Sequence, residues 1–485
     1  MANLFQASLS GVRWSALSQL CAQGMQYVSF VWLARLLSPS DFGTVATATL
    51  AVGLLSMLNE LGLGAALIQR PDLRPGHLNA GFWSNVAVGL ALWAGLVASA
   101  SALAGFFHNA AVAPILAALG ASFPVVGLAV VPKALLERAL RFKALGLADA
   151  LAAIANALFA IALALRGAGA WSLVVGTLAG YAVQAIVLYA ACRWRPGWRF
   201  GRGELAALFG FGASVLGSRL LSYASANVDY LMIGRVLGPG ALGAYSLAYK
   251  LVTWPMLKIS HVTLRVAYPA FARLQEDQPA FRAAYAKLVA TLALATFPLL
   301  TGLALLAPQL IPLVFGAGWT AAVGPTQVLC LAGLLKALVC SIGTVFMSRG
   351  RPDLELKLNL AGLAVLALSV GLGVRSGILG VAIAVAASTL VGAPVQQVVA
   401  LKLIGLRAGA FLEGLRAPFL ATLALALALG GWIMIAMPLG LPAWGVLAGG
   451  TLVGALIYPA MLSLLGFDWL RLARHLAGRR AAPAA

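Results

Sequence analysis

The chain has 485 residues, of which 62% are hydrophobic and only 9% are charged, and its mean hydropathy is +0.96. Soluble domains average roughly 45–50% apolar and about 25% charged residues, so this composition excludes a soluble globular enzyme. Apolar stretches recur along the whole chain, and each is long enough to cross about 30 Å of hydrocarbon as a helix. The sequence therefore predicts an all-α polytopic membrane protein.

The formal net charge of +20 does not indicate nucleic acid binding. The basic residues are spread over many short segments instead of forming one basic domain, which is typical of membrane topology signals. The four cysteines have no paired spacing of the metal or redox kind, so we expect no disulfide, no metal site and no cofactor. They are Cys21, Cys192, Cys330 and Cys340.

Turn-forming residues divide the chain into about fourteen predicted helices. The first is expected to be a retained helix, because the N-terminus lacks the compact pattern of a signal peptide. The longest predicted loops are 265–284 and 306–325. The predicted helices are 12–37, 42–67, 80–106, 112–135, 144–165, 170–191, 206–236, 241–265, 284–306, 325–348, 356–374, 377–402, 415–437 and 443–465.

The positions of Lys and Arg predict the orientation. If the N-terminus is cytoplasmic, 25 of the 33 basic residues fall on the cytoplasmic side, four fall on the opposite side and four lie at membrane depth. Cytoplasmic loops carry the excess of Lys and Arg in membrane proteins. We therefore expect a multi-pass membrane protein with both termini in the cytoplasm.

A turn motif occurs twice. The sequence RLLSPSDFG at 35–43 returns as RVLGPGALG at 235–243, an offset of 200 residues that spans six predicted helices. Because six is an even number, both copies face the same side, which predicts two parallel six-helix repeats related by an axis along the membrane normal. We expect an N-terminal lobe at 1–200, a C-terminal lobe at 201–405, and an extra helix pair with a cytoplasmic tail at 406–485.

The residues of the repeated motif have the chemistry of a tight turn between helices. An arginine complements the negative C-terminal end of a helix, a proline stops the helix, and a glycine relaxes the backbone. We interpret these residues as structural. They are Arg35, Pro39 and Gly43 in the first copy, and Arg235, Pro239 and Gly243 in the second.

Three N-terminal stretches carry a family resemblance. ALSQ at 16–19, FVWLARLLSPSDFG at 30–43 and LGLGAALIQ at 61–69 resemble the start of bacterial Wzx-type polysaccharide flippases. These flippases belong to the multidrug/oligosaccharidyl-lipid/polysaccharide exporter superfamily. The resemblance implies two six-helix lobes around a central cavity that opens alternately to each side, with an undecaprenyl-diphosphate-linked oligosaccharide as cargo. It implies membrane lipids as further partners, with a polymerase and other polysaccharide assembly proteins as candidates.

Cations at membrane depth are the candidate substrate ligands, because a charge there is costly and usually faces a cavity or a partner. Arg and Lys would neutralise a diphosphate, whereas amides and aromatic rings suit sugars. A spacing of three or four residues places several of these groups on common helix faces. The candidates are Arg219, Tyr223, Asn227, Lys250, Lys258 and Lys336, together with Gln19, Gln23 and Gln26 on the first helix.

Two acidic residues at depth have a separate interpretation. Glu60 and Asp229 would either bind a coupling cation or proton, or pair with a neighbouring Lys or Arg. Pairing is the commoner fate of such residues.

Two other functions remain open on the sequence. A multidrug or organic-cation antiporter of the same superfamily would need buried carboxylates, but here the cations outnumber the acids at depth. A membrane enzyme of polysaccharide assembly would need an acidic pair or a His cluster on a sizeable loop. No D-x-D, P-loop or H-E-x-x-H motif occurs, so we expect a transporter without enzymatic activity.

The predicted orientation is tested by cysteine labelling. A single cysteine placed within 312–319, on a cysteine-free background, should react with an impermeant thiol reagent in whole cells because this segment is expected to face the periplasm. Labelling that appears only after the cells are broken would contradict the orientation.

Overall fold

A computed structural model describes residues 19, 21–59, 64, 67, 68, 70, 72–198, 213–274 and 276–466. For 213–219, 261, 262, 264–270 and 272 the backbone alone is described. The described residues form helices and contain no strand. The helices of 20 or more residues are α2 (Pro39–Asn59), α4 (Pro75–Phe106), α7 (Phe142–Leu165), α8 (Ala170–Cys192), α10 (Ala213–Val236), α11 (Gly238–Arg273), α12 (Gln278–Phe315), α15 (Pro352–Gly373), α16 (Gly377–Ile404), α17 (Ala408–Ala436) and α18 (Ala443–Leu464). The shorter helices are α5 (Val112–Gly120), α6 (Ser122–Arg138), α13 (Val323–Val339) and α14 (Ile342–Ser348), with 3-10 turns η1 (Ala317–Ala322) and η2 (Val374–Ser376).

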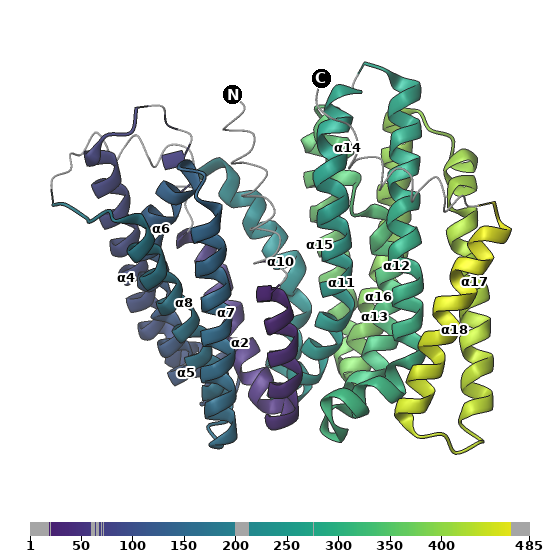
Figure 1. Cartoon of the computed structure of the whole chain (residues 1–485), viewed down its shortest axis with the longest axis horizontal. Helices are drawn as coiled ribbons and strands as arrows, with labels where there is room; N and C mark the ends of the chain where they lie inside the picture. Colours follow the sequence, from purple (N-terminus) through teal and green to yellow (C-terminus); the bar gives the residue numbers. More distant parts are fainter. Residues whose placement is uncertain are drawn as a thin grey trace. The chain divides into compact units, whose positions relative to one another are not determined.

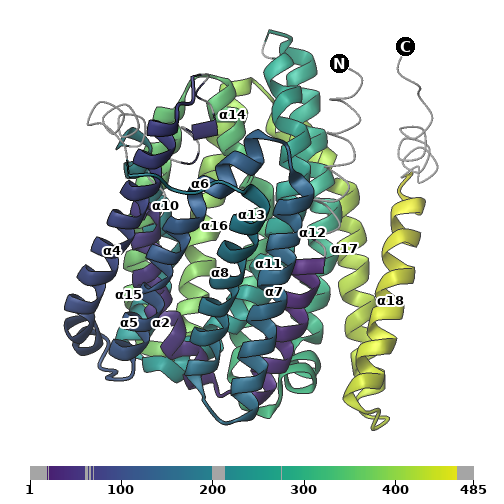
Figure 2. The ribbon, with the colours of Figure 1, turned by 60° about the vertical axis from the view of Figure 1, so that its left-hand side comes forward.

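The chain divides into two compact units, Met1–Ser246 and Leu247–Ala485, which we call unit 1 and unit 2. In unit 1, α7 packs along α8, α4 packs against α5 and α6, and α2 packs against α5 and α10. In unit 2, α12 contacts α13, α17 and α18, and α16 contacts α13 and α15. Helices α17 and α18 run side by side in Figure 1 and again in Figure 2. The predicted lobes 1–200, 201–405 and 406–485 stay a prediction.

The helices lie where hydropathy predicts them, and the chain is an all-helical, polytopic membrane protein. Residues 21–36 are helical, as expected for the first predicted helix. Ten helical segments among the described residues are long and apolar enough to cross a membrane. One of them, Pro352–Ile404, contains both α15 and α16, which the turn η2 separates at the predicted break. The count of fourteen stays a prediction.

Two predicted helices are broken. The helix expected at 112–135 is formed by α5 and α6, which are separated at Ala121. Pro124 explains this break, because in a continuous helix its ring would clash with the carbonyl of residue 120, whereas in the first turn of α6 it is tolerated. The helix expected at 325–348 is likewise divided into α13 and α14.

The two long loops expected from hydropathy are largely helical. Helix α11 continues to Arg273 and α12 begins at Gln278, so little of the expected loop 265–284 remains. The Asp277 carboxylate caps α12 by accepting a hydrogen bond from the Ala280 N–H at 3.0 Å. Helix α12 also runs on to Phe315, and η1 follows it within the expected loop 306–325. Dividing the chain at turn-forming residues misses these extensions because Pro269, Pro308 and Pro312 lie within helices instead of ending them.

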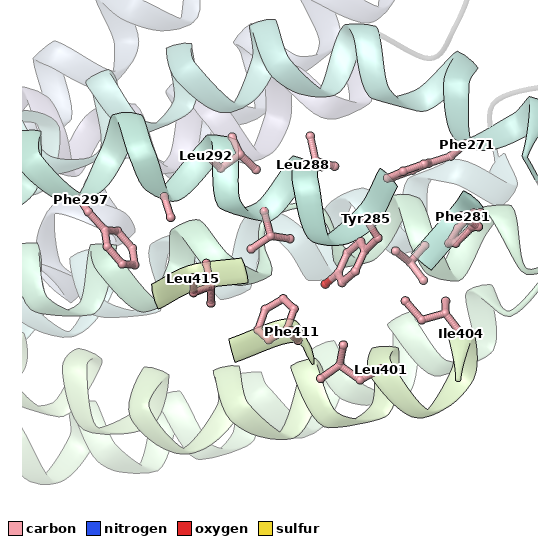
Figure 3. Packing of buried hydrophobic residues seen from close by; sticks show 13 residues of the cluster. Phe271, Phe281, Tyr285, Leu288, Leu292, Phe297, Leu401, Ile404, Phe411 and Leu415 are labelled. Carbon is pink, nitrogen blue, oxygen red and sulfur yellow. The ribbon is translucent and has the colours of Figure 1, made fainter. Parts of the chain in front are cut away.

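An aromatic cluster in unit 2 holds the end of α11 and the start of α12. The Phe271 and Phe281 rings lie 5.0 Å apart, and the Tyr285 ring stacks on Phe411 at 6.3 Å. Figure 3 shows these side chains packed together with Leu401 and the other aliphatic residues of the cluster. Burying a large apolar side chain contributes roughly 1.5–3 kcal/mol, so the cluster extends α11 and α12 as helices past the apolar spans.

The two copies of the turn motif pack against each other within unit 1. Gly43 lies against the backbone of Pro239 and Gly243, and Gly243 lies in the same way against Pro39 and Gly43. A Cβ atom added to either glycine would overlap the proline carbonyl of the other copy. Such a reciprocal contact is what a local two-fold axis between like segments requires.

Adding a methyl group at this contact should destabilise the protein. We expect Gly43→Ala to lower the free energy of unfolding by about 1–3 kcal/mol, because the backbones must separate. The matched control is Gly240→Ala in the second copy, where a Cβ meets no atom within 4 Å. Thermal unfolding of the purified proteins measures both. Equal melting temperatures for the two variants would contradict the contact.

Candidate functional site

Two of the polar side chains predicted on α10 donate hydrogen bonds to backbone carbonyls of helices. The Tyr223 hydroxyl donates a hydrogen bond to the Leu50 carbonyl of α2 at 2.7 Å, and Gly53 leaves room for the ring. The Asn227 amide donates to the Tyr223 carbonyl one turn earlier at 2.8 Å. Arg219 lies on α10 as well, but its side chain is outside the described residues. That these three residues line a cavity stays a prediction.

Asp229 is a buried carboxylate with tyrosine neighbours. It is 3% exposed, and it accepts hydrogen bonds from the Tyr245 hydroxyl at 2.7 Å and from the Tyr230 N–H at 2.9 Å. The rings of Tyr230 and Tyr245 meet edge to face, with centroids 5.8 Å apart. Sequence reasoning missed Tyr245, which lies 16 residues from Asp229 beyond the turn between α10 and α11. Glu60, the other acid considered, lies outside the described residues.

Two of the predicted cations lie against aromatic rings in unit 2. The Lys336 Nζ on α13 is 5.9 Å from the centroid of the Tyr249 ring on α11. The Lys250 Nζ is 6.0 Å from the Trp254 ring centroid, one turn along α11. Lys258 follows on the same helix with an exposed side chain. The structure therefore brings Lys250 and Lys336 close to aromatic faces, and Tyr249 is the partner that sequence reasoning missed.

A glycine allows this approach of α11 to α13. A Cβ atom at Gly333 would lie 3.1 Å from Val252 Cγ1 and 2.9 Å from Leu300 Cδ1, so only glycine fits without displacing these side chains. Lys336 follows Gly333 by three residues, and Tyr249 precedes Val252 by three. The close packing at Gly333 thus brings the ammonium of one helix to the ring of the other.

The chemistry of this group suits an anionic ligand with attached sugars. A cation–π contact contributes about 0.5–2 kcal/mol and leaves donors of the ammonium able to bind phosphate oxygens. Aromatic faces offer apolar surfaces to sugar rings. We call Tyr249, Lys250, Trp254, Lys258 and Lys336 the cation–aromatic group.

The three glutamines predicted as substrate ligands on the first helix lie in unit 1. Gln19 and Gln26 are exposed and Gln23 is half-buried, on the helix that includes 21–36. The Gln26 carbonyl accepts a hydrogen bond from the Ser29 hydroxyl at 3.1 Å. Their role toward a substrate stays a prediction.

The arginine of the second turn copy binds the end of α4. Arg235 donates to the Phe106 carbonyl, lies 4.9 Å over the Phe106 ring and contacts the His108 ring. In the first copy, Asp41 accepts a hydrogen bond from the Ala170 N–H at the start of α8, at 2.9 Å. Both contacts join the ends of helices at one end of unit 1. Among the described residues, no group of three or more His, Cys, Asp or Glu is placed to hold a metal.

Removing the Tyr223 hydroxyl should weaken the contact between α10 and α2. We expect Tyr223→Phe to lower the free energy of unfolding by about 0.5–1.5 kcal/mol, the usual net value of one hydrogen bond. Tyr189→Phe, at a half-buried position of α8, is the control and should change little, because its hydroxyl makes no hydrogen bond to the described residues. Thermal unfolding distinguishes the two, and an unchanged Tyr223→Phe protein would show that the hydrogen bond adds nothing.

Comparisons with known proteins agree with this fold. The family model described as polysaccharide biosynthesis protein matches residues 32–324. The chain is 30% identical over 466 residues to the teichuronic acid biosynthesis protein TuaB of Bacillus subtilis, covering 95% of this chain and 96% of that protein. It is 28% identical over 364 residues to the lipopolysaccharide biosynthesis protein WzxC of Escherichia coli, covering 74% and 73% of the two.

A solved structure of the lipid II flippase MurJ, in an inward closed conformation, matches with a TM-score of 0.73 at 14% identity. The match covers 93% of this chain and 98% of MurJ, and it shows that the fold is that of a two-lobe transporter. The family match spans more than half of the chain, and TuaB is aligned over nearly its whole length. The chain therefore belongs to the polysaccharide biosynthesis protein family.

Proposed function

We propose that the protein is a flippase that carries a polyprenyl-diphosphate-linked oligosaccharide across the bacterial inner membrane for surface polysaccharide synthesis. It works by alternating access and catalyses no covalent reaction. The observation that carries the proposal is the cation–aromatic group, in a chain whose family makes polysaccharides.

The cargo presents two kinds of surface to the protein. The diphosphate loses its hydration when it enters the membrane, and the ammonium groups of Lys250, Lys258 and Lys336 replace part of that hydration with charge-assisted hydrogen bonds. An ammonium at membrane depth costs about 2.5–3.5 kcal/mol on insertion scales, and an anionic cargo would offset part of that cost. The rings of Tyr249 and Trp254 accept the first sugar. Arg219 on α10 is a further candidate for the diphosphate.

The predicted orientation indicates which end of the protein faces the periplasm. Both termini are cytoplasmic in the proposed topology, which places the repeated turns at the periplasmic end. There the Gly43 and Gly243 backbones are in contact and Arg235 holds the end of α4. A polymerase that acts on the released product is the expected partner.

The antiporter alternative is less well supported. An organic cation needs a carboxylate that is open to it, whereas Asp229 is buried and already accepts hydrogen bonds from Tyr245 and Tyr230. The carboxylate would have to break these bonds before it could bind a drug. We therefore assign the membrane-depth charge of this chain to an anionic cargo.

Neutralising the cations should stop export while leaving the protein in the membrane. Because a hydrogen bond to a charged group contributes about 1.5–3 kcal/mol, we expect Lys336→Gln and Lys258→Gln to lower export roughly 10-fold to 100-fold. Arg219→Gln should behave in the same way. The measurement is surface polysaccharide per amount of membrane-inserted protein, together with lipid-linked intermediates, which should accumulate on the cytoplasmic side.

The control is Lys402→Gln, which removes an exposed charge at the end of α16 and should export normally. Near-normal export from Lys336→Gln, Lys258→Gln and Arg219→Gln would overturn the diphosphate assignment. Export lost in proportion to inserted protein would show instead that these residues serve folding.

A further inference from the structure

A short non-helical segment, 193–198, crosses one end of unit 1 after α8. Arg193 ends α8 in a left-handed conformation, with φ of 55°. The segment is then fixed to α4 by two hydrogen bonds, from the Gly197 N–H to Asn79 Oδ1 at 2.9 Å and from the Trp83 indole to the Gly197 carbonyl at 3.0 Å. Its backbone is therefore held in one place although it has no helical hydrogen bonds.

Two tryptophans of this segment point to different surroundings. Trp194 packs edge to face on Phe82, which is buried, with centroids 5.6 Å apart. Trp198 stacks on Trp83 at 4.1 Å with an angle of 23° between the rings, and yet remains 78% exposed. Trp194 therefore anchors the segment, whereas the Trp198 ring is exposed and stacks on Trp83.

Basic residues are frequent on this segment and at the helix ends on the same side of unit 1. Helix α6 ends at Arg138, α7 begins at Phe142, α8 ends at Cys192 and α4 begins at Pro75, so these four helix ends share one side of unit 1. Glu137 is the acid within the described stretches 131–143 and 193–198. The exposed basic residues of these stretches are Lys133, Arg138, Arg141, Lys143, Arg193 and Arg195.

Some of these arginines also donate hydrogen bonds to backbone carbonyls on this side of unit 1. Arg141 donates to the Ala191 carbonyl at 2.9 Å, which joins the start of α7 to the end of α8. Arg138 donates to the Arg70 carbonyl, and Arg195 donates to the Trp194 carbonyl at 3.1 Å. The charges are therefore held on an ordered surface. We call Trp83, Trp198, Arg193 and Arg195 the Trp198 platform.

We propose that the Trp198 platform binds the phosphate headgroups of anionic membrane lipids. Indole rings favour the headgroup level of a bilayer, and clustered Lys and Arg beside membrane helices attract anionic lipids. One guanidinium group can donate two parallel hydrogen bonds to a phosphate group. An acidic soluble protein would satisfy the charge as well, but it would not explain a widely exposed indole at the ends of membrane helices.

A lipid bound here would act on the connection between α8 and α10. The chain continues from Trp198 toward α10, the helix that contacts α2 through Tyr223. Anionic lipid would therefore add to the two hydrogen bonds that hold the first residues of this connection. The inference concerns a site separate from the cargo site and does not depend on the proposed function.

The test uses the purified full-length protein in a neutral detergent. Short-chain phosphatidylglycerol and phosphatidylcholine are titrated, and the melting temperature and the number of bound lipids by native mass spectrometry are recorded. We expect phosphatidylglycerol to raise the melting temperature more than phosphatidylcholine. Arg193→Asn combined with Arg195→Gln should lose most of this difference, and asparagine is chosen because it tolerates the left-handed conformation.

The matched control removes two exposed basic residues at the end of α16 and just beyond it, Lys402→Gln with Arg407→Gln, and should keep the difference. Trp198→Ala keeps every charge and should weaken phosphatidylglycerol binding, which tests the platform even if the double variant does not fold. An equal loss in the control pair, or an unchanged response in both platform variants, would overturn the proposal. Binding of polyglutamate in competition with the lipid and with higher affinity would overturn it in favour of an acidic protein partner.

Discussion

The absence of water in the hydrocarbon is the constraint on which the rest of the structure depends. Every backbone N–H and C=O must find a partner within the protein, which is why the spans are helices. The same constraint acts on small polar side chains. Thr296 in α12 and Thr422 in α17 each donate a hydrogen bond to the carbonyl four residues earlier, so these hydroxyls are satisfied by their own helix. A polar residue in such a chain is informative only when its side chain reaches beyond its own helix.

Three side chains on α10, α11 and α13 do so. Tyr223 reaches the backbone of α2, Tyr245 reaches Asp229, and Lys336 lies over the ring of Tyr249. Each of these contacts pairs a polar group with a tyrosine, whose ring is compatible with an apolar interior while its hydroxyl or π-face satisfies a charge or a carbonyl. Tyrosine thus helps to hold charged groups within the membrane helices.

Much of the fold was predictable from the sequence, and less of the site was. Hydropathy located the helices because burial in lipid requires long apolar segments, but an average over a window does not register the break before Pro124 or the polar first turns of α12. The cations were visible because charge is rare at depth. Tyr249 and Tyr245 were not, since a tyrosine in an apolar helix has no pattern that marks its partner.

The repeated turn motif shows the same limit of prediction from sequence. A motif found twice indicates that two segments have similar structure, and it does not indicate that they touch. Here the glycine of each copy lies on the proline backbone of the other. The duplicated segments are therefore not independent in evolution: a larger residue in one copy displaces the other, so neither can diverge freely at this position. The internal symmetry of the sequence is maintained where the protein packs against its own duplicate.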